Sequence, residues 1–267
     1  QNIVKSILVD REFSEEFSIA AVNSINWSRV MFQIVYYFYT LIENNISENE
    51  AINFSVPTGN FGDIYAGYVG IKMGLPANKL IIATNENDIL DRFINSGNYS
   101  IENVTRTTSP SMDIAIASNF ERLLFDLYDK SSSLTSKKMN ELKNNKSFSV
   151  NSEQSDLVKK IFSSKKINQN EVNDLIKETY NEFNYIIDPH TAIGLGASRS
   201  LNQIGDNNFI LGTAHPIKFS DTVEKAIGQP MQSSEEFNKV FDNEEKFYSF
   251  KNSTDEVRNI IKDNYSK

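Results

Sequence analysis

The stretch that decides the fold reads Ile52-Asn53-Phe54-Ser55-Val56-Pro57-Thr58-Gly59-Asn60-Phe61-Gly62-Asp63. Its first half is a short apolar run of the kind found in buried strands. A loop with two glycines follows, and apolar residues at helical spacing resume over residues 64–73. A second strand pattern covers residues 80–84. This order of strand, glycine loop, helix and strand predicts a parallel α/β sheet.

Helical patterns lie on both sides of this unit. Apolar residues three or four apart predict a strong helix over residues 27–42, with Asn26 as its N-cap. Amphipathic spacing predicts further helices over residues 120–128, 155–162 and 170–183. Residues 131–150 carry the weakest pattern and are predicted to form a surface connection.

Composition excludes several classes of function. The 267 residues carry a net charge of −8, which argues against a nucleic-acid-binding surface. There are no cysteines and only two histidines, His190 and His215, so neither a disulfide framework nor a metal site is expected. The longest apolar stretch, residues 30–42, is shorter than the roughly 20 residues of a membrane helix. We therefore expect a cytoplasmic protein that binds neither nucleic acid nor membrane.

The glycine loop Gly59-Asn60-Phe61-Gly62 is the best single candidate site. Two glycines between a strand and a helix allow backbone N–H groups to converge on an anion at the positive end of the helix. The alternative is a tight turn in which glycine only supplies a positive φ. The loop matches neither the Walker motif nor the dinucleotide-binding fingerprint.

Thr213 is the second candidate, because it follows a predicted strand at the sheet edge where open α/β folds bind ligands. A hydroxyl partner would leave a pyridine nitrogen unprotonated; the alternative is an ordinary turn threonine. His190 precedes an apolar helix and is interpreted as a helix-start residue rather than a base. For His215, a structural role is at least as well supported as a chemical one. Arg29 and Lys218 are candidates for binding phosphate or carboxylate, or are surface charges.

Six strings occur in one order along the chain: Asn23-Ser24-Ile25-Asn26-Trp27-Ser28-Arg29, Ser55-Val56-Pro57-Thr58-Gly59-Asn60-Phe61-Gly62-Asp63, Ala83-Thr84-Asn85-Glu86-Asn87-Asp88, Ser111-Met112-Asp113-Ile114, Asp188-Pro189-His190-Thr191-Ala192 and Gly212-Thr213-Ala214-His215-Pro216-Ile217-Lys218-Phe219. Together they resemble the threonine synthases of the fungal and enterobacterial type. The resemblance implies a fold-type-II enzyme dependent on pyridoxal 5'-phosphate (PLP), with a large and a small α/β domain.

The resemblance also implies roles for individual residues. Gly59, Asn60, Phe61, Gly62 and Asp63 would hold the PLP phosphate, and Thr213 would meet the pyridine nitrogen. Asn23, Asn26 and Arg29 would help to hold the substrate. The family converts O-phosphohomoserine and water to threonine and phosphate, by γ-elimination and then β-addition, in the final step of threonine biosynthesis.

Three regions follow from the resemblance. Residues 1–20 are expected to be a remnant of the small domain, and residues 21–232 the large domain, a mostly parallel sheet flanked by helices. The large domain is expected to carry a helical insertion near residues 120–185. Residues 233–267 are expected to form a polar helical tail.

The family's Schiff-base lysine lies in a Phe-Lys-Asp string, which does not occur in this sequence. We therefore expect no catalytic residue in these residues, and expect the chain alone to be inactive and the full-length protein active. The chain is expected to associate with its missing N-terminal segment or with further copies. Two alternatives stay open: a phospho-lyase that releases an oxo acid and ammonia from the same substrate, and a non-catalytic module that keeps the phosphate loop.

Overall fold

The computed structural model describes residues 2–20, 23–47, 50, 52–201, 207–232, 234–241 and 243–265. The chain divides into two units, Trp27–Gln232 on the one hand and Gln1–Asn26 with Ser233–Lys267 on the other. Within the three predicted regions, residues 1, 21–22, 48–49, 51, 202–206, 233, 242 and 266–267 lie outside the described residues.

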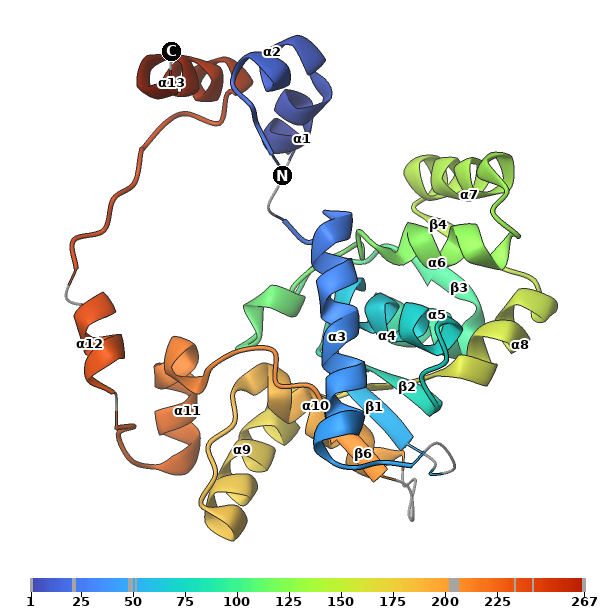
Figure 1. Ribbon diagram of the computed structural model, residues 1–267, viewed down its shortest axis with the longest axis vertical. Helices are drawn as coiled ribbons and strands as arrows, with labels where there is room; N and C mark the ends of the chain where they lie inside the picture. The colour runs from blue at the N-terminus through green and yellow to red at the C-terminus, as the bar shows by residue number, and fades with distance from the viewer. Residues whose placement is uncertain are drawn as a thin grey trace. The chain divides into compact units, whose positions relative to one another are not determined.

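The larger unit is built on a four-stranded parallel sheet in the order β5-β2-β1-β6 (Figure 1). Its strands are β1 (Ile52–Pro57), β2 (Ala77–Thr84), β5 (Phe162–Lys166) and β6 (Asn207–Ile210). The central strand β1 is buried along its whole length, with Phe54 paired to Leu80 on one side and Phe209 on the other. The predicted parallel α/β sheet is confirmed.

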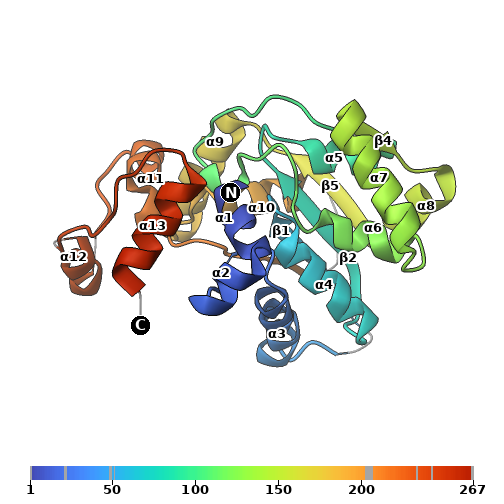
Figure 2. The ribbon, with the colours of Figure 1, turned by 90° about the horizontal axis from the view of Figure 1, so that it is seen from above.

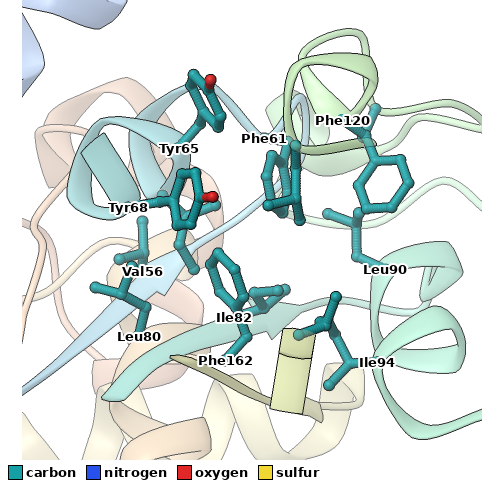
Figure 3. Close-up of a cluster of buried hydrophobic side chains, with 14 of the residues drawn as sticks. Val56, Phe61, Tyr65, Tyr68, Leu80, Ile82, Leu90, Ile94, Phe120 and Phe162 are labelled. Atoms are coloured by element: carbon teal, nitrogen blue, oxygen red, sulfur yellow. The ribbon is translucent and has the colours of Figure 1, made fainter. Parts of the chain in front are cut away.

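Alternating side chains of β2 point to two hydrophobic layers. Leu80 and Ile82 join the cluster of Figure 3, whereas Ile81 and Ala83 join a second cluster on the other face. Helices α3 (Trp27–Glu43), α4 (Gly62–Lys72) and α5 (Ile89–Ser96) contribute to the first cluster. Helices α9 (Gln169–Phe183), α10 (Pro189–Ser200) and α11 (Ser220–Ile227) contribute to the second. Figure 2 shows α3 and α4 on one side of β1 and α9 and α10 on the other.

The predicted helices over residues 27–42, 120–128, 155–162 and 170–183 correspond to α3, α6 (Phe120–Leu127), α8 (Ser152–Ile161) and α9. The prediction of a mere connection over residues 131–150 is wrong. These residues form α7 (Ser132–Asn145) and β4 (Ser147–Ser149), which pairs with β3 (Asn98–Ser100). The Ser131 hydroxyl caps α7, and Leu142 and Phe148 are buried in the core, an anchoring that local spacing does not reveal.

Strand β5 was not anticipated inside the range 120–185, which thus holds strands β4 and β5 as well as helices. Its sequence, Phe-Ser-Ser-Lys-Lys, has little strand propensity. It becomes a strand because it pairs in register with β2, from Phe162 beside Leu80 to Lys166 beside Thr84.

The smaller unit joins the two ends of the chain. It contains α1 (Asn2–Val9), α2 (Arg11–Glu16), α12 (Glu235–Phe241) and α13 (Thr254–Tyr265). Asp10 caps α2 and forms an ion pair with Arg258 of α13 at 2.5 Å, while the Arg258 guanidinium lies 5.4 Å from the Phe13 ring centroid. Within the described residues, no helix combines the length and apolar character needed to cross a membrane.

Candidate functional site

A cavity of about 240 Å³ lies at the end of β1 where the chain turns into α4. Ligands of open α/β sheets bind at this carboxyl edge of the strands. The wall consists of residues 57–64, Ser111 and Met112, Thr213 and Ala214, His190, and Arg29 and Gln33 of α3. Thr213 lies 150 residues after Asp63 in the sequence. The structure nevertheless brings Thr213 and the glycine loop into one cavity wall.

Gly59 is required by a close contact with a neighbouring segment. A Cβ at this position would lie 2.8 Å from the Ser111 carbonyl oxygen and 3.1 Å from the Met112 Cα, and both are backbone atoms. The positive φ of the loop belongs instead to Phe61, at 67°. The alternative that the glycines supply the positive φ is therefore wrong, because the strained position is occupied by a buried aromatic residue.

Phe61 anchors the loop despite its left-handed backbone. Its ring is 1% exposed and packs edge-on against Phe120 at 5.4 Å between centroids, with Phe162 at 5.9 Å (Figure 3). A left-handed conformation of a residue with a Cβ costs about 1–2 kcal/mol. Burial of a phenylalanine side chain contributes about 2–3 kcal/mol, which is enough to hold the loop in this shape.

Asn60 holds the same loop through its backbone and its side chain. Its carbonyl oxygen accepts from the N–H of Asn119 at 2.9 Å and from the Asn119 side chain at 3.2 Å. Its Oδ1 accepts from the N–H of Gly62 at 2.8 Å. Among the described residues, no protein oxygen accepts from the N–H groups of Asp63 and Ile64 in the first turn of α4. These two donors lie at the positive end of the helix and are suited to an anion.

Asp63 is the acidic residue of the described cavity wall. The Tyr37 hydroxyl donates to its backbone oxygen at 2.8 Å and lies 3.3 Å from its Oδ1. Burial raises the pKa of the Asp63 carboxyl to about 6, and the Tyr37 hydrogen bond lowers it only in part. Asp63 can therefore be neutral in mildly acidic solution.

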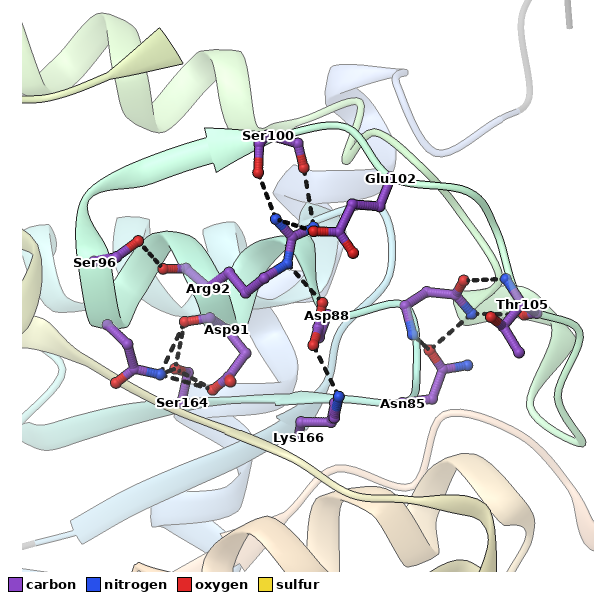
Figure 4. Close-up of polar contacts among 12 residues, drawn as sticks. Asn85, Asp88, Asp91, Arg92, Ser96, Ser100, Glu102, Thr105, Ser164 and Lys166 are labelled. Carbon is purple, nitrogen blue, oxygen red and sulfur yellow. Dashed lines mark hydrogen bonds and ion pairs between the residues drawn. The ribbon is translucent and has the colours of Figure 1, made fainter. Parts of the chain in front are cut away.

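A polar network fixes the segment that contacts Gly59. The Asp113 carboxylate accepts from the side chains of Asn85 and Asn87 at 2.9 Å each, and from the Thr107 hydroxyl at 2.7 Å. Figure 4 shows the Asp88 carboxylate between Arg92, at 2.8 Å, and Lys166, at 3.0 Å, and Asn85 in a separate group of contacts near Thr105. Two strings that looked independent in the sequence, residues 83–88 and 111–114, thus form one support for the loop.

The remaining predicted residues occupy different surroundings. Thr213 is exposed to the cavity, beyond the end of β6. Arg29 lies in the first turn of α3 and also forms part of the cavity wall. Asn23 and Asn26 belong to the smaller unit, where Asn23 Oδ1 accepts from the N–H of Ile25 at 3.1 Å. Their substrate-binding roles stay predictions.

His215 has a local structural role. Its Nδ1 accepts from the N–H of Ile217 at 3.2 Å and caps the short 3₁₀ helix η2 (Pro216–Phe219). It lines a second pocket of about 390 Å³ together with Pro216 and Ile217. Lys218, on the same 3₁₀ helix, is exposed.

Comparisons with known proteins decide the family. The family described as "Threonine synthase, C-terminal" matches residues 191–261. The threonine synthase of Pseudomonas aeruginosa is 40% identical over 263 residues, which cover 98% of this chain and 56% of that protein. The chain belongs to the threonine synthase family. It spans about half the length of the curated relatives it matches.

Solved threonine synthases share the fold. The PLP-bound enzyme of Brucella melitensis superimposes with a TM-score of 0.92 at 39% identity, over 100% of this chain and 57% of that one. The yeast enzyme superimposes with a TM-score of 0.85 at 39% identity, over 98% of this chain and 56% of its own. The predicted family and the fold-type-II architecture are confirmed.

One residue of the cavity wall was missed as a site residue. His190 does lie at the start of α10, as predicted, but its ring is 3% exposed and forms part of the wall. Its Nδ1 is 2.8 Å from Asp188 Oδ1. The sequence carries a signal for the local geometry, since Asp188 followed by Pro189 marks a helix start, but not for the direction in which the ring points.

Proposed function

We propose that the full-length protein is a PLP-dependent threonine synthase, a carbon–oxygen lyase that acts on a phosphate ester. It converts O-phosphohomoserine and water to threonine and phosphate. The observation that carries the proposal is the meeting of the glycine loop and Thr213 in one cavity of a chain belonging to this family. The geometry of the cavity and the family relationship both support the proposal.

The loop fits the phosphate of PLP. Two first-turn N–H groups of α4, those of Asp63 and Ile64, have no protein acceptor among the described residues, and the helix start adds a partial positive charge. The close packing of Gly59 on Ser111 keeps the loop in position. Burial raises the pKa of the Asp63 carboxyl to about 6, so this carboxyl is more easily protonated beside a bound anion than an exposed aspartate would be.

Thr213 would meet the pyridine nitrogen, and a hydroxyl there leaves that nitrogen unprotonated. PLP, when bound, supplies an electron sink for charge that develops on the substrate carbons. Arg29 would bind an anionic group of the substrate, since a guanidinium matches phosphate and carboxylate oxygens in geometry. Asn23 and Asn26 would assist it in the assembled enzyme.

Catalysis would also require the lysine of the family's Phe-Lys-Asp string, which these residues do not contain. We propose accordingly that this chain by itself does not turn over substrate. The larger unit would correspond to most of the large domain, and residues 1–20 to part of the small domain.

The test uses the full-length protein with PLP and O-phosphohomoserine. We expect a visible absorption band of bound PLP, release of phosphate, and threonine as the organic product. A full-length protein that binds PLP but releases no phosphate would contradict the activity. An oxo acid with ammonia in place of threonine would show the phospho-lyase instead.

A pair of variants tests the cofactor site separately from the reaction. Thr213→Val removes the hydroxyl at nearly constant volume, whereas Thr213→Ser retains it. We expect the Val variant to alter the absorption spectrum of bound PLP and to lower activity at least tenfold, and the Ser variant to stay near the wild type. Equal spectra for all three proteins would remove Thr213 from the site.

A further inference from the structure

His190 is a buried titratable side chain in the cavity wall that none of the roles above uses. Its ring is 3% exposed, so it is almost completely withdrawn from solvent. It nevertheless belongs to the same wall as the glycine loop and Thr213. Its two ring nitrogens have different surroundings, and the difference indicates what the residue does.

The Nδ1 side of the ring is held by a carboxylate. Asp188 Oδ1 accepts from the His190 backbone N–H at 2.8 Å and lies 2.8 Å from Nδ1, while Oδ2 accepts from the N–H and the hydroxyl of Thr191. Burial alone would raise the pKa of Asp188, but these hydrogen bonds outweigh it and hold that pKa below its ordinary value. An ionised Asp188 requires a proton on Nδ1, so in the neutral ring Nε2 carries the lone pair.

The face of the ring is restrained as well. Phe219 lies against it with 4.8 Å between ring centroids and an interplanar angle of 55°. A carboxylate at one edge and an aromatic ring against the face leave the imidazole little freedom to rotate. Its orientation is therefore set before anything binds in the cavity.

Unlike Nδ1, which is paired with Asp188, the Nε2 atom of His190 makes no hydrogen bond within the described part of the protein. It is shielded from solvent and has no hydrogen-bond partner among the described residues. An unpaired buried polar atom costs about 1–3 kcal/mol, so a native structure retains one mainly where something else pairs with it. Because the His190 ring forms part of the cavity wall, a molecule bound in the cavity is the partner that we consider for Nε2.

We propose that His190 contacts PLP through Nε2, and that Asp188 is the residue that positions it. This inference rests on the proposed cofactor site. In the neutral ring, Nε2 accepts a hydrogen bond from a donor on the bound molecule, such as a hydroxyl group. His190 is thus a further polar contact to the ligand, contributed by α10.

Two substitutions separate this contact from a purely structural role. His190→Asn keeps an N–H that can reach Asp188 in place of Nδ1 and deletes the atom at Nε2. His190→Gln places a polar atom near the Nε2 position and gives up the contact with Asp188. A structural histidine predicts that the Asn variant behaves like the wild type, and a ligand-contacting histidine predicts that it does not.

The experiment measures PLP affinity of the full-length apoprotein by fluorescence titration, together with the melting temperature. We expect His190→Asn to melt near the wild-type temperature and to bind PLP about 5–30-fold more weakly, as loss of one buried hydrogen bond predicts. His190→Gln is expected to bind PLP more tightly than His190→Asn, even if it melts lower. Affinity of the Asn variant within twofold of wild type overturns the proposal.

Nitrogen NMR of histidine-labelled protein supplies a second measurement that does not depend on activity or stability. The His190 resonances are assigned as those missing from the Asn variant. Addition of PLP should shift the Nε2 signal strongly and the Nδ1 signal little. An unchanged Nε2 signal in a PLP-loaded protein overturns the inference, whereas a wild-type protein that binds no PLP overturns the proposed function instead.

Discussion

The two helices that begin at the cavity, α4 and α10, start in opposite ways. Helix α10 has an acidic N-cap, Asp188, whose carboxylate takes up the first N–H groups of the helix. Helix α4 begins after Phe61, whose side chain cannot cap it. Of the first three N–H groups of α4, only that of Gly62 has an acceptor among the described residues, the Asn60 side chain. One start is therefore closed by the protein, and the other keeps donors for a ligand.

This difference determines which of the two helix starts can bind an anion. A helix start that already holds a carboxylate repels a second anion, so α10 offers a side chain, His190, rather than its backbone. The start of α4 offers backbone N–H groups and attracts the phosphate. A single fold thus uses the same kind of helix end once for its own stability and once for binding.

The largest expected effect on stability comes from removing the N-cap of α10. Asp188→Ala removes the cap of α10 and leaves the His190 ring and two N–H groups without their acceptor. We expect a loss of about 3 kcal/mol in the free energy of unfolding, measured by urea denaturation. Asp188→Asn retains an acceptor and should lose less than half as much. Equal losses would show that the carboxylate charge, rather than the cap, stabilises α10.

The next effect concerns the packing that holds the open start in place. In Gly59→Ala the new methyl group would meet the Ser111 backbone at 2.8 Å, so the loop must shift. We expect a destabilisation of about 2 kcal/mol and PLP binding weakened at least tenfold. The control is Gly212→Ala, whose Cβ would lie 3.9 Å from the Thr191 hydroxyl in ordinary contact. Its unfolding free energy should stay within about 0.5 kcal/mol of wild type.

A smaller effect should depend on pH. The pKa of Asp63 is about 6 in the folded protein and near 3.8 in the unfolded chain, so the folded state binds the proton more tightly. The stabilising contribution is complete below the unfolded pKa and is lost as pH rises through about 6. For a partly exposed carboxyl, we expect this to change the free energy of unfolding by about 1.5 kcal/mol as the pH rises. Asp63→Asn should remove that pH dependence.

The measurement is the free energy of unfolding of wild type minus that of Asp63→Asn, between pH 5 and pH 8. Glu86→Gln serves as a control on another part of the larger unit. A pH dependence that persists unchanged in Asp63→Asn would assign the titration to a different group.

The smallest expected effect comes from freeing one more donor at the open start. Asn60→Ala removes the oxygen that accepts from the Gly62 N–H. We expect a stability loss of about 1 kcal/mol and a change in PLP affinity below tenfold, because a bound phosphate can take over that N–H. Denaturation with and without PLP measures both. If Asn60→Ala loses as much stability with PLP present as without it, the phosphate does not replace the Asn60 oxygen as the acceptor of the Gly62 N–H.

Much of the fold was readable from local patterns. The run from Ile52 to Asp63 predicted a buried parallel strand followed by a ligand loop, because burial on both faces demands continuous apolar residues. The spacing of α3 and α9 likewise predicted amphipathic helices. Strand β5 escaped prediction, since its Ser-Ser-Lys-Lys sequence becomes a strand only through pairing with β2.

The sequence by itself determined the family, the strand–loop–helix unit, and the candidate roles of the glycine loop and Thr213. These depend on local propensity and on motifs that lie within a few residues. Only the tertiary structure decided why Gly59 is a glycine, which residue carries the positive φ, and that His190 shares the cavity with the loop. Each of these depends on contacts between segments far apart in the chain, Gly59 with Ser111, Phe61 with Phe120 and Phe162, and His190 with Phe219. Such contacts arise only when the chain has folded, because close packing is a property of the assembled core.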